Sequence, residues 1–117
     1  MLEQNISRLV EQLRNKEITS VELTQSYLDK IKELNPGLNS YITVCSDTAL
    51  NAAKAADAAI EAGTAGPLAG IPIAHKDLFC TNGIKTTCAS KMLNNFVPPY
   101  ESTVTARIEQ AAAIMLG

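Results

Sequence analysis

The chain has 117 residues, and its 10 lysines and arginines against 12 aspartates and glutamates give a formal charge of −2 when the single histidine is neutral. Hydrophobic residues make up 46% and charged residues 19% of the chain, which is typical of an ordinary folded protein and argues against disorder or a membrane span. Because no basic excess is present, direct binding of nucleic acid through its phosphates is not expected. One domain, or part of one, is the expected organisation.

Charged residues and cysteines indicate the compartment. Charges between Glu3 and Glu17 interrupt the apolar core that a signal peptide needs, so we expect a cytoplasmic protein. Cys45, Cys80 and Cys88 are an odd number without CxxC spacing, and one histidine accompanies them. Neither a disulfide framework nor a four-ligand zinc site can be assembled from this set, so we expect reduced thiols and no metal or cofactor bound by this chain.

Two amphipathic helices are predicted at the N-terminus. Apolar residues recur at helical spacing over residues 6–13 and predict a first helix of about ten residues. Thr19 and Glu22 form a capping-box pattern for a second helix, which residues 35–37 (Asn-Pro-Gly) are expected to stop. Residues 1–37 should therefore form a peripheral hairpin that docks on the rest of the protein or on a partner. The stripe of the first helix comprises Ile6, Leu9, Val10 and Leu13.

Residues 38–117 are predicted to begin an α/β core. The β-prone residues 41–44 suggest a strand, and Ser46 is a plausible N-cap for the helix that follows. Along residues 49–62 the polar residues fall on one side and alanines make a smooth opposite face, which permits close packing on a sheet. Glycines and a proline in residues 63–67 end this helix.

A short apolar run, residues 71–76, reads as a buried strand that ends on a charge. A loop should follow from Asp77 to Lys85, around the turn pair Asn82-Gly83, and the prolines at 98 and 99 mark another irregular stretch.

A last helix and a further strand are predicted near the end of the chain. Ser102 should cap the helix, and residues 113–116 resemble the opening of a strand. Because the sequence stops at Gly117 on a bare apolar strand, we expect the chain to be the N-terminal part of a larger α/β protein. The expected buried side of the helix comprises Val104, Ile108, Ala111 and Ala112.

Lys76 closes the apolar run and is the candidate catalytic residue. Strand alternation would place it on the same side as Ala74 and away from His75, with small neighbours around its amine. An ordinary lysine has a pKa of about 10.4, and burial can lower it by up to about 3–5 units, which is the range that a general base needs. The spacing alone favours the simpler interpretation, a lysine at a strand end with its amine in water.

The residues around Lys76 resemble a known enzyme family. The run GIPIAHKD at residues 70–77 is similar to the stretch around the catalytic lysine of the amidase signature enzymes. Residues 83–99, GIKTTCASKMLNNFVPP, followed by Tyr100 and STVTARI, resemble the branch of that family in which a glutaminase-type subunit serves bacterial Asp-tRNA and Glu-tRNA. The resemblance includes the N-terminal helices and covers essentially the whole chain. It implies the first strands and helices of a mixed-sheet α/β fold, whose remainder lies beyond Gly117.

The resemblance also implies a mechanism and partners. The family uses a Ser, cis-Ser, Lys triad, in which the lysine takes a proton from the bridging serine and that serine activates the nucleophile. Lys76 is the one matched position, because the serines belong to a later Gly/Ser-rich signature, so the 117 residues alone are expected to be inactive. Glutamine is the implied substrate, two further subunits, termed B and C, are the implied partners in a heterotrimer, and ATP and Mg²⁺ are expected at the B subunit. Ammonia would pass to misacylated tRNA, either Glu-tRNA(Gln) or Asp-tRNA(Asn).

Several alternatives remain open. His75 stands where many family members have a small or branched apolar residue, and we prefer a buried, hydrogen-bonded structural histidine to a catalytic one. A Cys80/His75 nucleophile is the rival covalent mechanism, but it lacks an orienting third group. Residues 86–90 could edge an active-site wall or form a closely packed loop of small residues. Two other functions are a non-catalytic folding or interaction module and another amidase of the same family acting on small amides.

Overall fold

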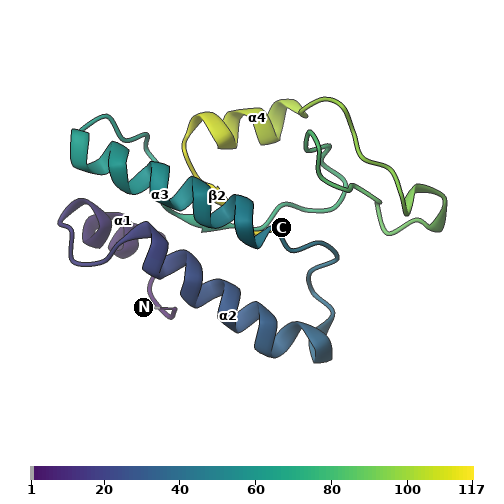
Figure 1. The fold of residues 1–117 in the computed structure, drawn as a ribbon, viewed down its shortest axis with the longest axis horizontal. Coiled ribbons are helices and arrows are strands. Elements are labelled where there is room, and N and C mark those ends of the chain that lie inside the picture. The colour runs from purple at the N-terminus through teal and green to yellow at the C-terminus, as the bar shows by residue number, and fades with distance from the viewer. Residues whose placement is uncertain (1) are drawn as a thin grey trace.

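The computed structural model describes residues 2–117, and this part of the chain folds as helices around a small parallel sheet (Figure 1). Strands β1 (Pro72–Ile73) and β2 (Ile114–Met115) pair in parallel, with Pro72 opposite Ile114 and Ile73 opposite Met115. The α/β class is therefore confirmed. The helices are α1 (Ile6–Arg14), α2 (Ser20–Leu38), α3 (Ser46–Ala62), the 3-10 helix η1 (Lys91–Leu93) and α4 (Thr103–Gln110).

Two apolar clusters hold these elements together. Helices α2 and α3 lie side by side, and the alanine face of α3 packs against α2 and β2, with Ala53 fully buried (Figure 1). Small side chains allow this close approach, as the sequence predicted. The first cluster comprises Leu28, Ala49, Ala53, Ala56, Ile114 and Leu116, and the second, which joins α1 and α2 to the start of β1, comprises Leu9, Leu13, Leu23 and Ile71.

The start of α2 ties the N-terminal hairpin to the core. The predicted capping box is present, since the Thr19 hydroxyl accepts from the Glu22 N–H at 3.1 Å and the Glu22 carboxylate accepts from the Thr19 N–H at 3.0 Å. Asp57 of α3 adds a second cap, because its two carboxylate oxygens accept from the N–H groups of Ser20 (2.6 Å) and Val21 (3.1 Å). A carboxylate at a helix N-terminus satisfies free N–H groups and the helix dipole together.

Helix α2 continues past the predicted stop and ends at Leu38, with Pro36 inside it. A proline removes one intrahelical hydrogen bond, but Pro36 lies in the exposed last turn, where water can satisfy the freed carbonyl. The helix ends at Asn39, which adopts the left-handed conformation (φ 52°) and donates its N–H to the Asn35 carbonyl at 2.7 Å. The Asn35 side chain then holds the backbone of Tyr41 through both its N–H and its carbonyl.

The predicted strand at residues 41–44 is wrong, because this segment is irregular. β-propensity needs a neighbouring strand to become a ladder, and the segment is joined to the end of β2 by the Cys45 N–H, which donates to the Leu116 carbonyl at 2.8 Å. The predicted cap at Ser46 is also wrong. Cys45 is the N-cap of α3, without a side-chain cap hydrogen bond, and Ser46 is the first helical residue.

One predicted strand and two predicted burial patterns also change. The predicted strand 71–76 shortens to β1, and Ile6 is exposed (58%) because α1 turns only Leu9 and Leu13 fully inward. Ser102 caps α4 as predicted, with its hydroxyl accepting from the Thr105 N–H at 3.1 Å. The buried residue of α4 is Thr105, whose hydroxyl lies 3.1 Å from the Cys80 carbonyl, whereas Val104 is exposed. Ile108, Ala111 and Ala112 are half-buried, so the predicted buried side of α4 is correct in part.

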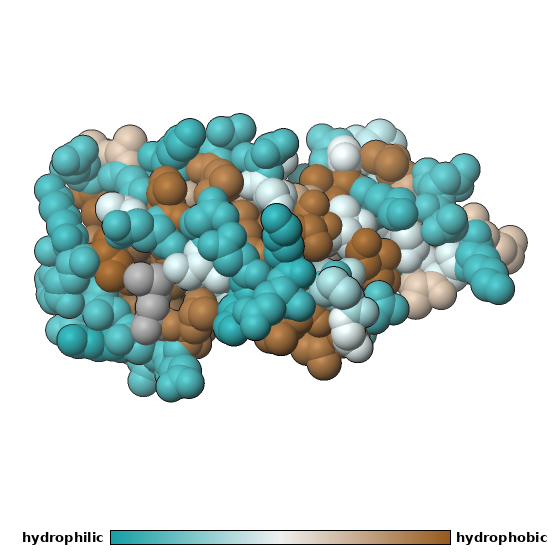
Figure 2. Space-filling view, turned by 60° about the horizontal axis from the view of Figure 1, so that its bottom comes forward, coloured by the Kyte–Doolittle hydropathy of each residue, from teal (hydrophilic) through white to brown (hydrophobic). Residues whose placement is uncertain are grey.

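Apolar side chains remain at the surface of the described residues. Figure 2 shows the molecule turned so that the bottom of the view in Figure 1 comes forward, and hydrophobic residues lie between hydrophilic ones on this face. Leu38 is 66% exposed and Met92 is 92% exposed. Among the described residues, no helix combines the length and the hydropathy needed to cross a membrane.

Candidate functional site

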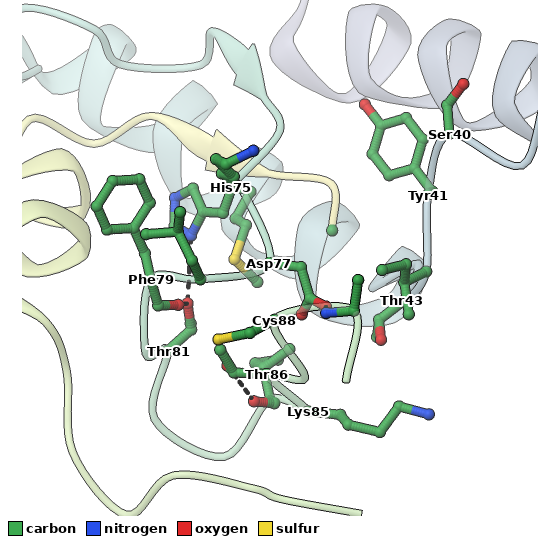
Figure 3. Close-up of a pocket in the computed structure, with 17 residues that line it drawn as sticks. Ser40, Tyr41, Thr43, His75, Asp77, Phe79, Thr81, Lys85, Thr86 and Cys88 are labelled. Carbon is green, nitrogen blue, oxygen red and sulfur yellow. Dashed lines mark hydrogen bonds between the residues drawn. The ribbon is translucent and has the colours of Figure 1, made fainter. Parts of the chain in front are cut away.

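A pocket of about 460 Å³ lies beside the end of β1 (Figure 3). Residues 40–43 line one side, residues 75–79 and Thr81 follow β1 along the other, and residues 84–86, 88 and 89 return between them. Figure 3 shows Tyr41 and Thr43 on the opposite side of the pocket from His75 and Phe79. The pocket lies at the carboxyl ends of the two parallel strands, where α/β proteins commonly bind ligands.

Lys76 lines this pocket, three residues after the end of β1. Its carbonyl accepts from the Phe79 N–H at 3.1 Å, which starts the turn that follows the strand. The side chain is exposed among the described residues, so the burial on which the sequence argument depended is not present in this part of the chain. Strand alternation also fails here, because β1 ends at Ile73 and His75 lines the same pocket as Lys76.

Asp77 holds the loop that forms the next part of the pocket wall. Its carboxylate accepts hydrogen bonds from the Thr87 N–H (2.9 Å), the Thr87 hydroxyl and the Ala89 N–H (3.3 Å). Its carbonyl accepts from the Cys88 N–H at 2.8 Å. Burial raises the pKa of Asp77, but the hydrogen bonds from Thr87 and Ala89 and the nearby Lys85 charge outweigh it, so this pKa lies below its ordinary value.

Residues 86–90 are partly a pocket wall and partly a packed loop, and the role of this wall in an active site stays a prediction. Thr86, Cys88 and Ala89 line the pocket. Thr86 and Thr87 are both buried, and Thr87 is hydrogen-bonded to Asp77. The sequence did not indicate the role of Asp77. The available signal was a hydrogen-bond acceptor, Asp77, directly after the lysine, together with the pair Thr86-Thr87 about ten residues later. Neither a helix nor a strand period predicts a contact at this spacing.

His75 is half-buried and lies between this pocket and a smaller one of about 190 Å³ that Glu101 also lines. Its Nδ1 is 3.3 Å from the Thr81 hydroxyl (Figure 3), and that hydroxyl donates to the Phe79 carbonyl at 3.3 Å. We therefore assign the ring proton to Nδ1, which leaves Nε2 buried and without a partner within the described residues. The ring is hydrogen-bonded, as the preferred structural interpretation expects, but it is half-buried at a pocket and not fully buried.

Burial lowers the pKa of His75 below its ordinary value of about 6.5, and the Glu101 carboxylate offsets this only in part. We expect the His75 ring to titrate with a midpoint below 6.5, as measured by the pH dependence of its NMR shifts in this chain, where it is the single histidine. The unfolded chain then binds the proton at higher pH than the folded chain. The contribution of His75 to the free energy of unfolding is therefore fully present above about pH 6.5, and it is lost as the pH falls through the folded-state pKa. A midpoint at or above 6.5 would contradict this.

The rival Cys80/His75 mechanism finds no support in these contacts. The Cys80 thiol lies 3.5 Å from the Tyr100 hydroxyl, and His75 bonds to Thr81. Cys45 and Cys80 are half-buried free thiols and Cys88 is an exposed one. Residues 2–117 contain no group of three or more histidine, cysteine or acidic side chains that could hold a metal ion.

The profile of the amidase family matches residues 22–117. The chain belongs to the amidase family. Two relatives that carry the name of the A subunit of glutamyl-tRNA(Gln) amidotransferase, from Marinomonas sp. (strain MWYL1) and Azoarcus sp. (strain BH72), are 62% and 54% identical to it. Each alignment covers all 117 residues of this amidase-family chain and 24% of the relative, so the chain spans about a quarter of the length of these proteins.

Solved amidase structures share the fold of this chain. The native peptide amidase from Stenotrophomonas maltophilia superposes with a TM-score of 0.91 at 32% identity, over 98% of this chain and 24% of that protein. A bacterial aryl acylamidase of the amidase signature family superposes with a TM-score of 0.88 at 28% identity, over 97% of this chain and 24% of that protein. The helices and the β1–β2 pair are therefore part of an amidase signature fold.

Proposed function

We propose that this chain is the lysine-bearing part of a glutaminase subunit that supplies ammonia for the amidation of Glu-tRNA(Gln) or Asp-tRNA(Asn). One observation carries the proposal: Lys76, in the family run GIPIAHKD, lines a pocket at the carboxyl end of β1. Identity of 62% over the full chain with a protein named as the A subunit of glutamyl-tRNA(Gln) amidotransferase supports the choice of this branch of the family.

In the proposed reaction, Lys76 Nζ accepts a proton from a bridging serine, and that serine takes the proton of the nucleophilic serine. The nucleophile attacks the side-chain carboxamide carbon of glutamine. The proton held on Lys76 Nζ then returns through the bridging serine to the amide nitrogen, so that ammonia leaves as the acyl-enzyme forms. Water then cleaves the acyl-enzyme to give glutamate and the free serine. Both serines would come from residues outside these 117, since none of the serines here has the glycine neighbours of the family signature.

The remaining partners follow from the same proposal. The B and C subunits would complete a cytoplasmic heterotrimer, in which the B subunit would bind ATP and Mg²⁺ to activate the misacylated carboxylate. The chain carries a formal charge of −2, which supports placing most tRNA contacts elsewhere in the complex.

The test is ammonia release by the complete subunit, cloned with the coding sequence that follows the Gly117 codon. We expect glutamine hydrolysis that increases when the B and C subunits, ATP and misacylated tRNA are added, and we expect none from the 117-residue chain. Efficient hydrolysis of small amides at a rate that does not change when the B and C subunits and tRNA are added would instead identify another amidase of the family. A complete subunit with no amidase activity would leave only a folding or interaction module.

A further inference from the structure

We propose that Asp77 is a positioning residue that fixes the pocket wall formed by Thr86, Cys88 and Ala89 relative to Lys76, and that this clamp determines how tightly the carboxamide substrate binds. The inference rests on the proposed function, because it concerns the substrate of the same pocket. We call the set of hydrogen bonds from Thr87, Cys88 and Ala89 to Asp77 the Asp77 clamp.

The clamp acts on three successive residues of the loop. Both carboxylate oxygens of Asp77 are used, by the Thr87 N–H on one and by the Thr87 hydroxyl and the Ala89 N–H on the other, while the Cys88 N–H binds the Asp77 carbonyl. Thr87 is buried, with 4% of its surface exposed. Hydrogen bonds to a charged acceptor are stronger than neutral ones, so this anchor is well suited to hold a short loop.

The backbone of the loop needs such an anchor. Cys88 (φ 51°) and Ala89 (φ 55°) are consecutive non-glycine residues in the left-handed region, which L-residues rarely adopt. A conformation of this kind persists where surrounding contacts determine it. Cys88 and Ala89 are exposed on the pocket side, and their N–H groups are held by Asp77, with the Ala89 N–H also 3.2 Å from the Thr87 hydroxyl that itself donates to Asp77.

The position of Asp77 in the chain links the wall to the lysine. Asp77 follows Lys76 directly, and Figure 3 shows its side chain near Cys88, in the middle of the residues that line the pocket. The clamp therefore fixes the wall relative to the backbone that carries the lysine amine. Without it, the wall would move while Lys76 stays attached to β1, so substrate binding should suffer more than the chemical step.

The carboxylate itself is not available as a base for the substrate. The hydrogen bonds of the clamp occupy both oxygens, and the pKa of Asp77 lies below its ordinary value, so the group stays ionised in the neutral range. A role in position, and not in proton transfer, follows from these contacts.

The test is Asp77→Asn in the complete subunit with its partners. The asparagine amide keeps the shape but turns an NH₂ group toward at least one loop donor, so we expect KM for glutamine to rise about tenfold, with kcat reduced less than about threefold. Asp29→Asn is the matched control, because it removes the same charge from an exposed position on α2, where the carboxylate accepts from the Gln25 amide at 2.9 Å. This control should leave KM and kcat unchanged.

Thr87 provides a second route to the same clamp. Thr87→Val removes the hydroxyl donor and should raise KM for glutamine, as Asp77→Asn does. Thr87→Ser keeps the hydroxyl and should have the KM of the wild type. In the double variant, Thr87→Val should raise KM little beyond the value of Asp77→Asn alone. Unchanged KM in both Asp77→Asn and Thr87→Val overturns the proposal. A kcat for Asp77→Asn as low as that of Lys76→Ala, with KM unchanged, also overturns it by assigning Asp77 to the chemistry.

Amide hydrogen exchange of residues 86–90 tests the clamp without catalysis. Exchange should be faster in Asp77→Asn than in Asp29→Asn, and equal rates overturn the clamp whatever the activity. A complete wild-type subunit that releases no ammonia overturns the proposed function and the substrate part of this inference, while the exchange rates then decide the clamp by themselves. The two failures are therefore distinguishable.

Discussion

Replacing Lys76 with alanine in the complete subunit should reduce glutamine hydrolysis by about 10²–10⁴-fold, the contribution typical of a positioned general base. Lys76 lines the pocket at the end of β1 with an exposed side chain, so its removal should leave the fold intact. The measurement is single-turnover and steady-state ammonia release, with circular dichroism to confirm folding. Because the proposed role is proton transfer, kcat should fall while KM for glutamine changes little.

Two further variants test whether the Lys76 amine itself is needed: one keeps a positive charge at position 76, and the other removes a different lysine. Lys76→Arg keeps a cation that stays protonated at working pH, so it should be as inactive as Lys76→Ala. Lys54→Ala, on the exposed face of α3, removes a lysine far from the pocket lining and should keep full turnover. Normal turnover in Lys76→Ala would end the assignment of Lys76 as the base.

Replacing Gly70 with alanine should lower the free energy of unfolding by about 2–5 kcal/mol. Gly70 has a φ of +80°, and a Cβ there would lie 2.9 Å from both Cβ and Oγ of Ser20 and 3.3 Å from Leu13. The Ser20 hydroxyl also donates to the Gly70 carbonyl at 3.1 Å, so the side chain would force apart the junction of α1, α2 and β1. A loss of this size is a large share of the total stability of a domain, and the midpoint of chemical denaturation would report it.

Gly37→Ala is the matched control for this substitution. Gly37 lies in the last turn of α2, has no positive φ, and a Cβ there would meet nothing within 4 Å. Alanine is a better helix former than glycine, so we expect stabilisation by about 0.5–1 kcal/mol. Equal midpoints for the two variants would show that Gly70 is not confined by its neighbours.

The helices and several of their ends could be predicted because their signals are local. The capping box of Thr19 and Glu22, the glycine cap at Gly63 and the alanine face of α3 depend on residues a few positions apart. A strand was predicted at residues 41–44, where the structure is irregular. The local sequence shows β-propensity but does not specify whether a partner strand lies beside it. Pro36 misled for a related reason, since its cost depends on where in the helix it lies.

The candidate site was predicted only as far as its motif reaches. The resemblance singled out Lys76, and the structure places that residue in the pocket lining, but its catalytic role stays a prediction. The Asp77 clamp joins residues ten and twelve positions apart through a loop without periodicity. Sequence patterns report secondary-structure periods, so a contact of this kind becomes visible only in three dimensions.

The parallel pairing of β1 with β2 has a consequence for the order in which the chain matures on the ribosome. Residues 72 and 73 find their strand partners only at residues 114 and 115, whereas α1, α2 and α3 can assemble from sequence already made. The edge of β1 therefore stays unpaired while some forty further residues are synthesised, which takes a few seconds at elongation rates of about 5–20 residues per second. During that interval an apolar edge is open to wrong partners, and prompt burial by nascent chain or chaperone would favour a high yield.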